Sequence, residues 1–313
     1  MRPPIVSFPA FLATALVAFV STASATTVSG TLGPQYGPPL VVQTSQSDVG
    51  GTGDPREPAN TNGGSQLDAA YGYISSGTLY LFFSGNLTFW LQLEGNITHW
   101  LPLDVFLDCA PGGQHRLLAN NPAVEPGSYD LNQAAGLTFD DGFAADYWLS
   151  LGGSNAESPW PRMNAYFASL PTGGGGSGAY LGGTLPGAPG VLSGGTDPGG
   201  IQVAFDDGNR LGLGSGCGAA TQVAVPTGIE WAIPLAAIGD PTGCIRVCAF
   251  VAGQDHSVIS NQVMGPIPPG TCGLTPAAAT DFSSVPGDQF FTICPAVTPA
   301  RHGSWGTLKA FYR

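Results

Sequence analysis

Hydrophobic and polar positions alternate along much of the chain in the way that short β-strands require. In "LPLDVFLDC", residues 101–109, the apolar residues Leu103, Val105 and Leu107 occupy every second position. Successive side chains of a strand point to opposite faces of a sheet, so this period of two places the three residues on one face. The segment is therefore predicted to be a strand with one face toward a core.

Other segments repeat this template. "GTLYLFFSGNL", residues 77–87, contains an unbroken apolar run, which is typical of a strand buried on both faces. Gly, Pro, Asn and Asp separate it from further strand-like runs, namely "ADYWLSL", "IQVAFDD", "IEWAIPL", "CIRVCAFV" and "DQFFTIC", and "GPPLVVQT" near the start can add an edge strand. This pattern predicts an all-β fold, an antiparallel β-sandwich of the jelly-roll type with Gly-rich loop insertions.

Helical patterns are rare. "PRMNAYFASL", residues 161–170, has apolar residues at helical spacing from Met163 to Leu170, and it follows a proline that suits the first turn. We expect one short amphipathic helix there and a single turn in "LAAIGD" after Pro234. The fold should contain at most one or two short helices.

The chain divides into segments of different character. An arginine, a short apolar run and the small-residue sequence "ASA" are typical of a secretory signal peptide, and no later segment resembles a membrane span. We therefore expect a protein that is secreted or held at the cell surface. The tail contains "SWGTLKAFYR", which is either a sorting or anchoring signal or a strand docked on the domain. The expected parts are a signal peptide at 1–25, an edge strand and exposed loop at 26–64, a sandwich domain at 65–295 with a Gly-rich insertion at 172–200, and the tail at 296–313.

Charge narrows the choice of partners. The net charge is -12 and the chain has only nine Lys and Arg residues, with no basic cluster. Proteins that bind nucleic acid neutralise phosphates with such residues, so nucleic acid is excluded as an expected partner. Anionic membrane surfaces are disfavoured for the same reason. The excess of acidic residues is compatible with a neutral or cationic partner, or it serves only to keep the protein soluble.

The chain contains six cysteines, an even number that could pair completely. Disulfides persist in exported proteins, and the sequence does not fix their connectivity. A zinc site is the alternative, but thiolate zinc sites favour closer pairs than Cys244 and Cys248, which have three residues between them. The disulfide candidates are Cys109, Cys217, Cys244, Cys248, Cys272 and Cys294.

The order of four segments carries a family resemblance. "LDAAYGYISSGTLYLFFSGNL", "LDVFLDCAPGGQHRL", "WAIPLAAIG" and "IRVCAFVAG" follow one another between residues 65 and 255. This order resembles the β-sandwich group that includes family 9 carbohydrate-binding modules and DOMON-like domains. Asp108 matches the group's aspartate at a glycine-containing turn, and Glu230, with "IPLAAIG" after it, matches a mostly structural motif. The chain is also similar to exported bacterial proteins of unassigned role.

Two pairs of aspartates are candidate metal ligands. Loop carboxylates are the oxygen ligands that Ca²⁺ prefers, and secreted sandwiches often use such a site as a staple. The alternative is ordinary turn chemistry, because aspartate bonds readily to its own backbone in a turn. The candidates are Asp140 and Asp141 in "TFDDGF" and Asp206 and Asp207 in "FDDGN".

Aromatic residues are the best candidates for ligand contacts. The apolar faces of sugar rings stack on exposed indole or phenol rings, and a neutral glycan suits an acidic surface. Trp148 and Trp231 lie in strand-like runs, where packing in the core is the expected role. The candidate glycan-binding residues are Trp100, Trp160, Tyr147 and Tyr166.

Catalytic patterns are weak by comparison. A glycosidase needs two carboxylates about 5–10 Å apart, and Glu230 is the best placed of few glutamates. The sequence has no GxSxG elbow and no HExxH motif. It therefore favours a secreted or cell-surface module without enzymatic activity that binds carbohydrate or another surface component. A self-associating structural subunit of the cell envelope or of an appendage is the alternative, and a glycoside hydrolase is a distant third.

Overall fold

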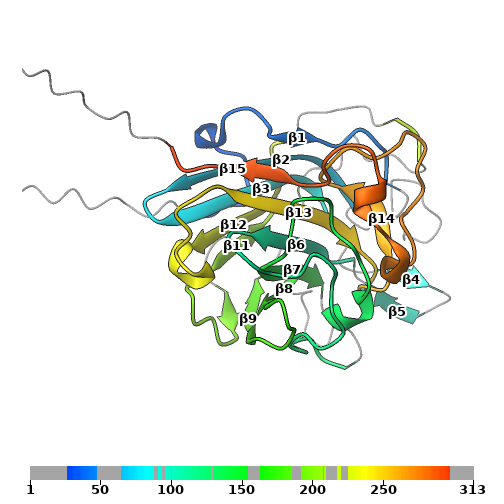
Figure 1. The fold of residues 1–313 in the computed structure, drawn as a ribbon. Helices are drawn as coiled ribbons and strands as arrows, with labels where there is room; N and C mark the ends of the chain where they lie inside the picture. The colour runs from blue at the N-terminus through cyan, green and yellow to red at the C-terminus, as the bar shows by residue number, and fades with distance from the viewer. Residues whose placement is uncertain are drawn as a thin grey trace, which may run out of the picture.

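The computed structural model describes residues 27–47, 65–87, 91–93, 96–99, 101–127, 130–153, 163–184, 192–206, 208, 217–219 and 225–296. In these residues two antiparallel sheets pack face to face (Figure 1). The predicted all-β sandwich is therefore confirmed. The helical elements are short 3₁₀ turns: η1 (Pro34–Tyr36), η2 (Leu131–Ala134), η3 (Leu235–Ile238), η4 (Ala277–Ala279) and η5 (Phe282–Ser284). No helix in the described part of the chain is long and apolar enough to cross a membrane.

The first sheet has five strands, and the predicted edge strand in "GPPLVVQT" is its outermost member. Its order in space is β1 (Val41–Val42), β2 (Gln66–Ser75), β3 (Thr78–Asn86), β12 (Gly228–Pro234) and β11 (Gln202–Phe205). The apolar run in "GTLYLFFSGNL" forms β3 near the middle of this sheet, and its residues are buried on both faces as predicted.

The second sheet has eight strands and contains most of the remaining strand-like runs. Its order is β10 (Ser193–Gly194), β9 (Gly178–Thr184), β8 (Met163–Ser169), β7 (Tyr147–Gly153), β6 (Leu103–Asp108), β13 (Ile245–Ala252) and β14 (Ile259–Val263), with β15 (Phe291–Ile293) also paired to β13. A separate hairpin consists of β4 (Leu91–Leu93) and β5 (Asn96–His99).

The main core lies between the two sheets. Leu103, Val105 and Leu107 of β6 all belong to it, which confirms the predicted period of two. The alternate residue Phe106 belongs to a second core on the outer face of the eight-stranded sheet. Both faces of this sheet are therefore buried, and alternate residues of a strand such as β6 pack in different cores.

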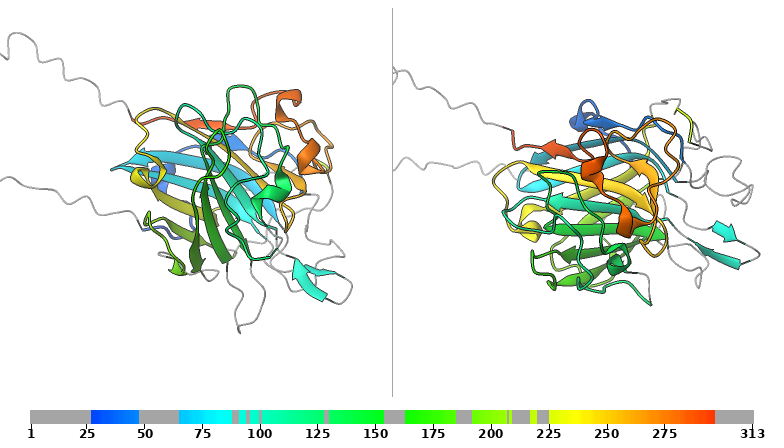
Figure 2. Two further views of the ribbon diagram at one scale, coloured as in Figure 1. Left: turned by 60° about the horizontal axis from the view of Figure 1, so that its bottom comes forward. Right: turned by 45° about the vertical axis from the view of Figure 1, so that its right-hand side comes forward.

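A layer without long strands covers that outer face. We call residues 114–127 and 130–145 the cover segment; its Leu117, Leu137 and Phe139 pack in the second core. Part of the chain after β14 joins it through Phe282. The right-hand view of Figure 2 shows these green and orange loops in front of the strands. On the opposite side of the molecule, Tyr36 packs on the outer face of the five-stranded sheet.

The helix predicted at residues 161–170 is wrong, because this region contains strand β8. Its backbone pairs with both β7 and β9, and a register shift lies between Ala165 and Tyr166. Met163 faces the main core, whereas Tyr166 faces the second core. The apolar residues of β8 are divided between the two faces of the sheet. Taken together along the sequence, they have the same spacing as the apolar residues on one face of a helix. The single turn expected after Pro234 is present as η3.

The Gly-rich segment 172–200 is partly regular structure. It contains β9 and β10, which extend the eight-stranded sheet to its edge. Gly182 has a φ of 125°, and a Cβ atom there would lie 2.8 Å from the carbonyl oxygen of Ser193. Only glycine suits this backbone conformation and this close approach of the neighbouring strand.

The cysteines form two disulfide bonds, Cys217–Cys272 and Cys244–Cys294. Complete pairing is therefore wrong, because Cys109 and Cys248 are free thiols. Cys248 lies in the second core, whereas Cys109 packs against the main core. The eight-stranded sheet separates the two thiols and prevents a third bond. Disulfides of this kind are typical of proteins that fold outside the cytosol.

Candidate functional site

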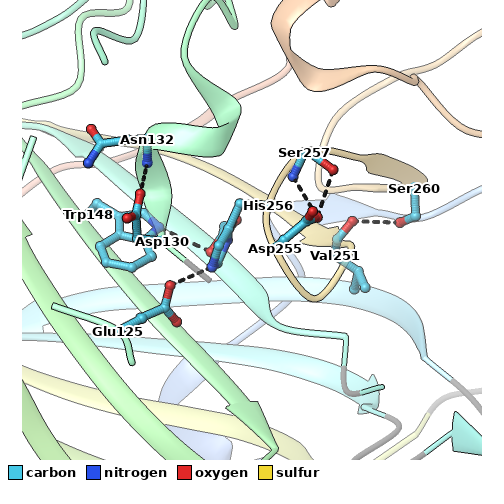
Figure 3. Close-up of polar contacts among 10 residues, drawn as sticks. Glu125, Asp130, Asn132, Trp148, Val251, Asp255, His256, Ser257 and Ser260 are labelled. Atoms are coloured by element: carbon cyan, nitrogen blue, oxygen red, sulfur yellow. Dashed lines mark hydrogen bonds and ion pairs between the residues drawn. The ribbon is translucent and has the colours of Figure 1, made fainter. Parts of the chain in front are cut away.

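The most distinctive polar group in the described residues is a buried histidine between two carboxylates. The Nδ1 atom of His256 lies 2.8 Å from Oδ2 of Asp104, and its Nε2 atom lies 2.7 Å from Oε2 of Glu125. The imidazole is wholly inaccessible to solvent, and both carboxylates are almost so. We call these three residues the histidine clasp. Figure 3 shows His256 and Glu125 pointing toward one another.

Three separate elements hold the clasp. Asp104 is on β6, at an alternate position that points away from the main core, and Glu125 comes from the cover segment. His256 lies in the turn between β13 and β14, where its N–H donates to the carbonyl oxygen of Gly253 at 2.9 Å. Its φ of 60° is unusual for a residue other than glycine and indicates a conformation held by its surroundings.

A tryptophan fixes the aspartate. The indole N–H of Trp148, on the neighbouring strand β7, donates to Oδ1 of Asp104 at 3.0 Å. The ring of Trp148 also meets the imidazole of His256 edge to face, with centroids 5.6 Å apart. Both oxygens of the Asp104 carboxylate are therefore engaged, and the imidazole is held by contacts as well as by hydrogen bonds.

Two ionised carboxylates require a charged imidazole between them. Each ring nitrogen faces a carboxyl oxygen, and while Asp104 and Glu125 are both ionised each nitrogen must donate, which only the imidazolium form with its two N–H groups can do. Burial alone would lower the pKa of His256, but the charges and hydrogen bonds of Asp104 and Glu125 outweigh it and raise this pKa well above its usual value. Burial also raises the pKa of Glu125, an effect that the charge of His256 only partly offsets.

This arrangement joins two layers of the fold. The imidazolium lies between β6 of the sheet and the cover segment, and it bonds to a carboxylate from each. A histidine that acts as a general base needs a ring nitrogen directed at a substrate, and here both nitrogens are directed at protein carboxylates. The clasp in this conformation is therefore a structural ionic link.

The predicted aromatic ligand-binding residues are dispersed. Tyr147 is partly exposed and stacks on Phe167, with ring centroids 5.5 Å apart. Tyr166 is only 7% exposed and packs against Tyr180 in the second core, on the other face of the sheet. Trp100 and Trp160 lie outside the described residues. The buried roles expected for Trp148 and Trp231 are confirmed, since both are fully buried.

Two of the predicted calcium ligands, Asp140 and Asp206, accept hydrogen bonds within the protein, whereas Asp141 lies exposed in the turn. The Asp140 carboxylate accepts the backbone N–H groups of Asp141 and Gln289, at 3.0 and 2.8 Å. Asp206 accepts the N–H of Gly208 at 2.8 Å, which is ordinary turn chemistry. Asp207 lies outside the described residues. Within them, no group of three or more His, Cys, Asp or Glu side chains is arranged to hold a metal ion. Calcium binding at these residues remains a prediction.

Glu230, the best-placed glutamate for hydrolysis, has a structural environment. It is buried in β12, and its Oε1 accepts the hydroxyl of Tyr36 at 2.9 Å. Its Oε2 accepts the backbone N–H groups of Ser29 and Gly30, at 2.6 and 3.0 Å. These bonds fasten the N-terminal segment to the outer face of the five-stranded sheet.

The clasp was missed from the sequence. Asp104 offered the only local signal, a charged residue in the middle of an apolar strand, and such a residue needs a buried partner. His256 lies 152 positions from Asp104 and 131 from Glu125, so no spacing rule brings the three together.

The comparisons with known proteins add nothing to this geometry. No protein-family model matches the chain, and neither a curated protein nor a solved structure shows significant similarity to it.

Proposed function

We propose that the chain is an extracellular β-sandwich module without enzymatic activity that binds a neutral glycan at one end of its eight-stranded sheet. The resemblance to family 9 carbohydrate-binding modules belongs to this proposal. The single observation that carries it is the position of the described strand ends next to Trp100 and Trp160. These are the two candidates expected to be exposed.

The strand pairing brings the starts of β6 and β8 to the same end of the sheet. Leu103, where β6 begins, pairs with Leu151 of β7, and Met163, where β8 begins, pairs with Gly153 at the end of β7. Because β6 and β8 flank β7 and their partners on β7 are two residues apart, these starting points lie roughly 12 Å apart. Each tryptophan precedes its strand by three positions in the sequence. We expect both indoles to contact one extended ligand.

Three of the described carboxylates support a binding role over hydrolysis. Glu230 and Asp140 accept hydrogen bonds from the protein itself, and Glu125 holds His256. A retaining or inverting glycosidase needs two carboxylates directed at one substrate. Carboxylates already bonded within the fold are poorly placed for that task.

Short edge strands support a separate module over a self-assembling subunit. β1 and β10, each at one edge of its sheet, have two residues each, and β11 and β14 at the other edges have four and five. Short edge strands are one way in which proteins avoid pairing edge to edge with further copies. Sedimentation of the mature chain distinguishes the two roles: a monodisperse monomer agrees with the module, and concentration-dependent assembly favours the structural subunit.

Binding to a panel of soluble and insoluble polysaccharides tests the proposal. The disulfide-intact chain from residue 26 should bind one of them saturably, and Trp100→Ala or Trp160→Ala should abolish that binding. Leu40→Ala is the matched control, because Leu40 is a 44% exposed apolar residue next to β1, on the other sheet. Absence of binding to every glycan, or full binding by both tryptophan variants, contradicts the proposal.

A further inference from the structure

The histidine clasp connects the cover segment to the sheet by a charge that can be removed. The cover segment also packs on the sheet through apolar residues such as Leu137 and Phe139, and these contacts do not change with pH. Its ionic contact with His256 depends on one proton, because the imidazole has two N–H groups only when protonated. A single deprotonation therefore alters the link between two layers of the fold.

The consequences of deprotonation follow from the surroundings of His256. Neutral imidazole donates from one nitrogen only, so the other nitrogen would direct a lone pair at a carboxylate oxygen about 3 Å away. Asp104 and Glu125 would then be two buried negative charges without a cation between them. Asp104 keeps its bond from Trp148 on the rigid sheet. Glu125 is therefore the carboxylate that can move away from His256, and the cover segment that carries it moves away from the sheet.

Protonation of Glu125 has a different effect. A neutral carboxyl group still offers its carbonyl oxygen to the N–H at Nε2, so the hydrogen bond between the layers survives. The clasp then changes from a net negative to a neutral group, which lowers the electrostatic penalty of burial. Mild acid should therefore preserve the clasp, unlike the many histidine switches that open when they gain a proton.

The other titratable groups nearby do not replace His256. Asp130, which caps η2, and Tyr166 of β8 interact electrostatically with Glu125. The carboxylate of Asp130 also accepts the N–H of Asn132 at 2.7 Å. Burial raises the pKa of Tyr166 far above neutrality, so this residue keeps its proton when His256 titrates. Asp255, next to His256 in the turn, is bonded to the N–H and hydroxyl groups of Ser257.

We infer that the Asp104, His256 and Glu125 clasp is a proton-operated latch, which holds the cover segment on the eight-stranded sheet while His256 is protonated and releases it in alkali. Release exposes the outer face of the sheet around Phe106 and Trp148. The latch uses none of the tryptophans of the proposed glycan site.

Hydrogen exchange measured by mass spectrometry tests the latch. Amide protection, corrected for the intrinsic pH dependence of exchange, is followed in the full mature chain from about pH 6 upward until the imidazole of His256 has lost its proton. In the cover segment it should fall by about a hundredfold or more, as expected when a buried charge loses its partner. The strands β3 and β12 of the other sheet should keep their protection.

Two variants and a control make the test specific. Glu125→Gln removes one of the charges that hold the proton on His256, so release should occur at a lower pH. His256→Gln should abolish the pH dependence. His115→Gln is the control, because His115 lies in the cover segment and contacts the carbonyl oxygen of Phe143 away from the clasp. It should leave the midpoint unchanged.

Three results overturn the latch. The first is constant protection of the cover segment while His256 titrates. The second is simultaneous loss of protection in β3 and β12, which indicates global unfolding. The third is a midpoint in Glu125→Gln equal to that of the parent chain, and this comparison holds even if His256→Gln does not fold.

Discussion

Trp148 and Asp104 are joined across neighbouring strands by a 3.0 Å hydrogen bond from the indole N–H to a carboxylate oxygen. Both residues are buried on the outer face of the eight-stranded sheet, where an unpaired carboxylate oxygen has no water to replace the donor. This bond orients the carboxylate toward His256. The histidine clasp therefore depends on Trp148, a residue that the strand pattern alone assigns to the core.

Trp148→Phe should destabilise the fold more than Trp231→Phe. Both tryptophans are fully buried, but the indole N–H of Trp231 has no hydrogen-bond partner in the described structure. The two substitutions remove similar volumes, and only the first leaves Asp104 with an unpaired oxygen. We expect a difference of about 1–3 kcal/mol in the free energy of unfolding, measured with urea. Equal losses in the two variants contradict the role given to the indole.

Tyr36→Phe should weaken the attachment of the N-terminal segment. It removes the 2.9 Å bond from the phenol to Glu230, and hydrogen bonds to charged groups contribute about 1.5–3 kcal/mol. A double-mutant cycle with Glu230→Leu, which removes the acceptor, isolates this contribution. The coupling energy should be clearly favourable, and additive effects of the two substitutions would show that the bond adds nothing.

Asp68 should make the fold less stable as the pH rises. Burial raises the pKa of its carboxyl group from 3.8 to about 6, and its Oδ2 atom has no hydrogen-bond partner. The folded state thus binds this proton more tightly than the unfolded state. The stability contribution is full below the unfolded pKa and is lost as the pH rises to the folded value.

Asp68→Asn should therefore raise the free energy of unfolding by about 1–2 kcal/mol at pH 8 and change it little near pH 4. Chemical denaturation at both pH values measures the difference. If Asp68→Asn stabilises the fold equally at pH 4 and at pH 8, the effect does not come from the proton of Asp68, and the prediction is contradicted.

The two free thiols should react only slowly in the native protein. Burial and the nearby acidic groups Asp146 and Asp108 raise the pKa of Cys109 to about 12, and burial raises that of Cys248 further. Alkylation followed by mass spectrometry should label Cys109 and Cys248 only slowly in the native protein. It should label two cysteines after denaturation without reductant, and all six after reduction. Labelling of no cysteine before reduction would reveal a third disulfide and contradict the separation of Cys109 from Cys248.

Much of the sandwich could be predicted because its strands obey local rules. The alternation in β6 and the apolar run in β3 identified both strands, and the turn residues between the runs indicated antiparallel pairing. β8 was mistaken for a helix because its apolar residues serve two cores, which a test for one amphipathic face cannot detect.

The candidate site could not be predicted because it is a product of tertiary structure. Asp104, Glu125 and His256 come from a strand, a cover segment and a turn that approach one another only in the folded sandwich. The pairing of the cysteines has the same cause, since the side of the sheet on which Cys109 and Cys248 lie decides that they stay apart.

The protonation state of His256 at neutral pH tests the account of the candidate site most directly. Nitrogen-15 chemical shifts of the imidazole distinguish a ring with two N–H groups from a ring with one. We expect two N–H groups in the folded chain, because each nitrogen faces a carboxylate oxygen within 2.8 Å. A neutral ring with a single N–H group at this pH would contradict the histidine clasp, and with it the latch.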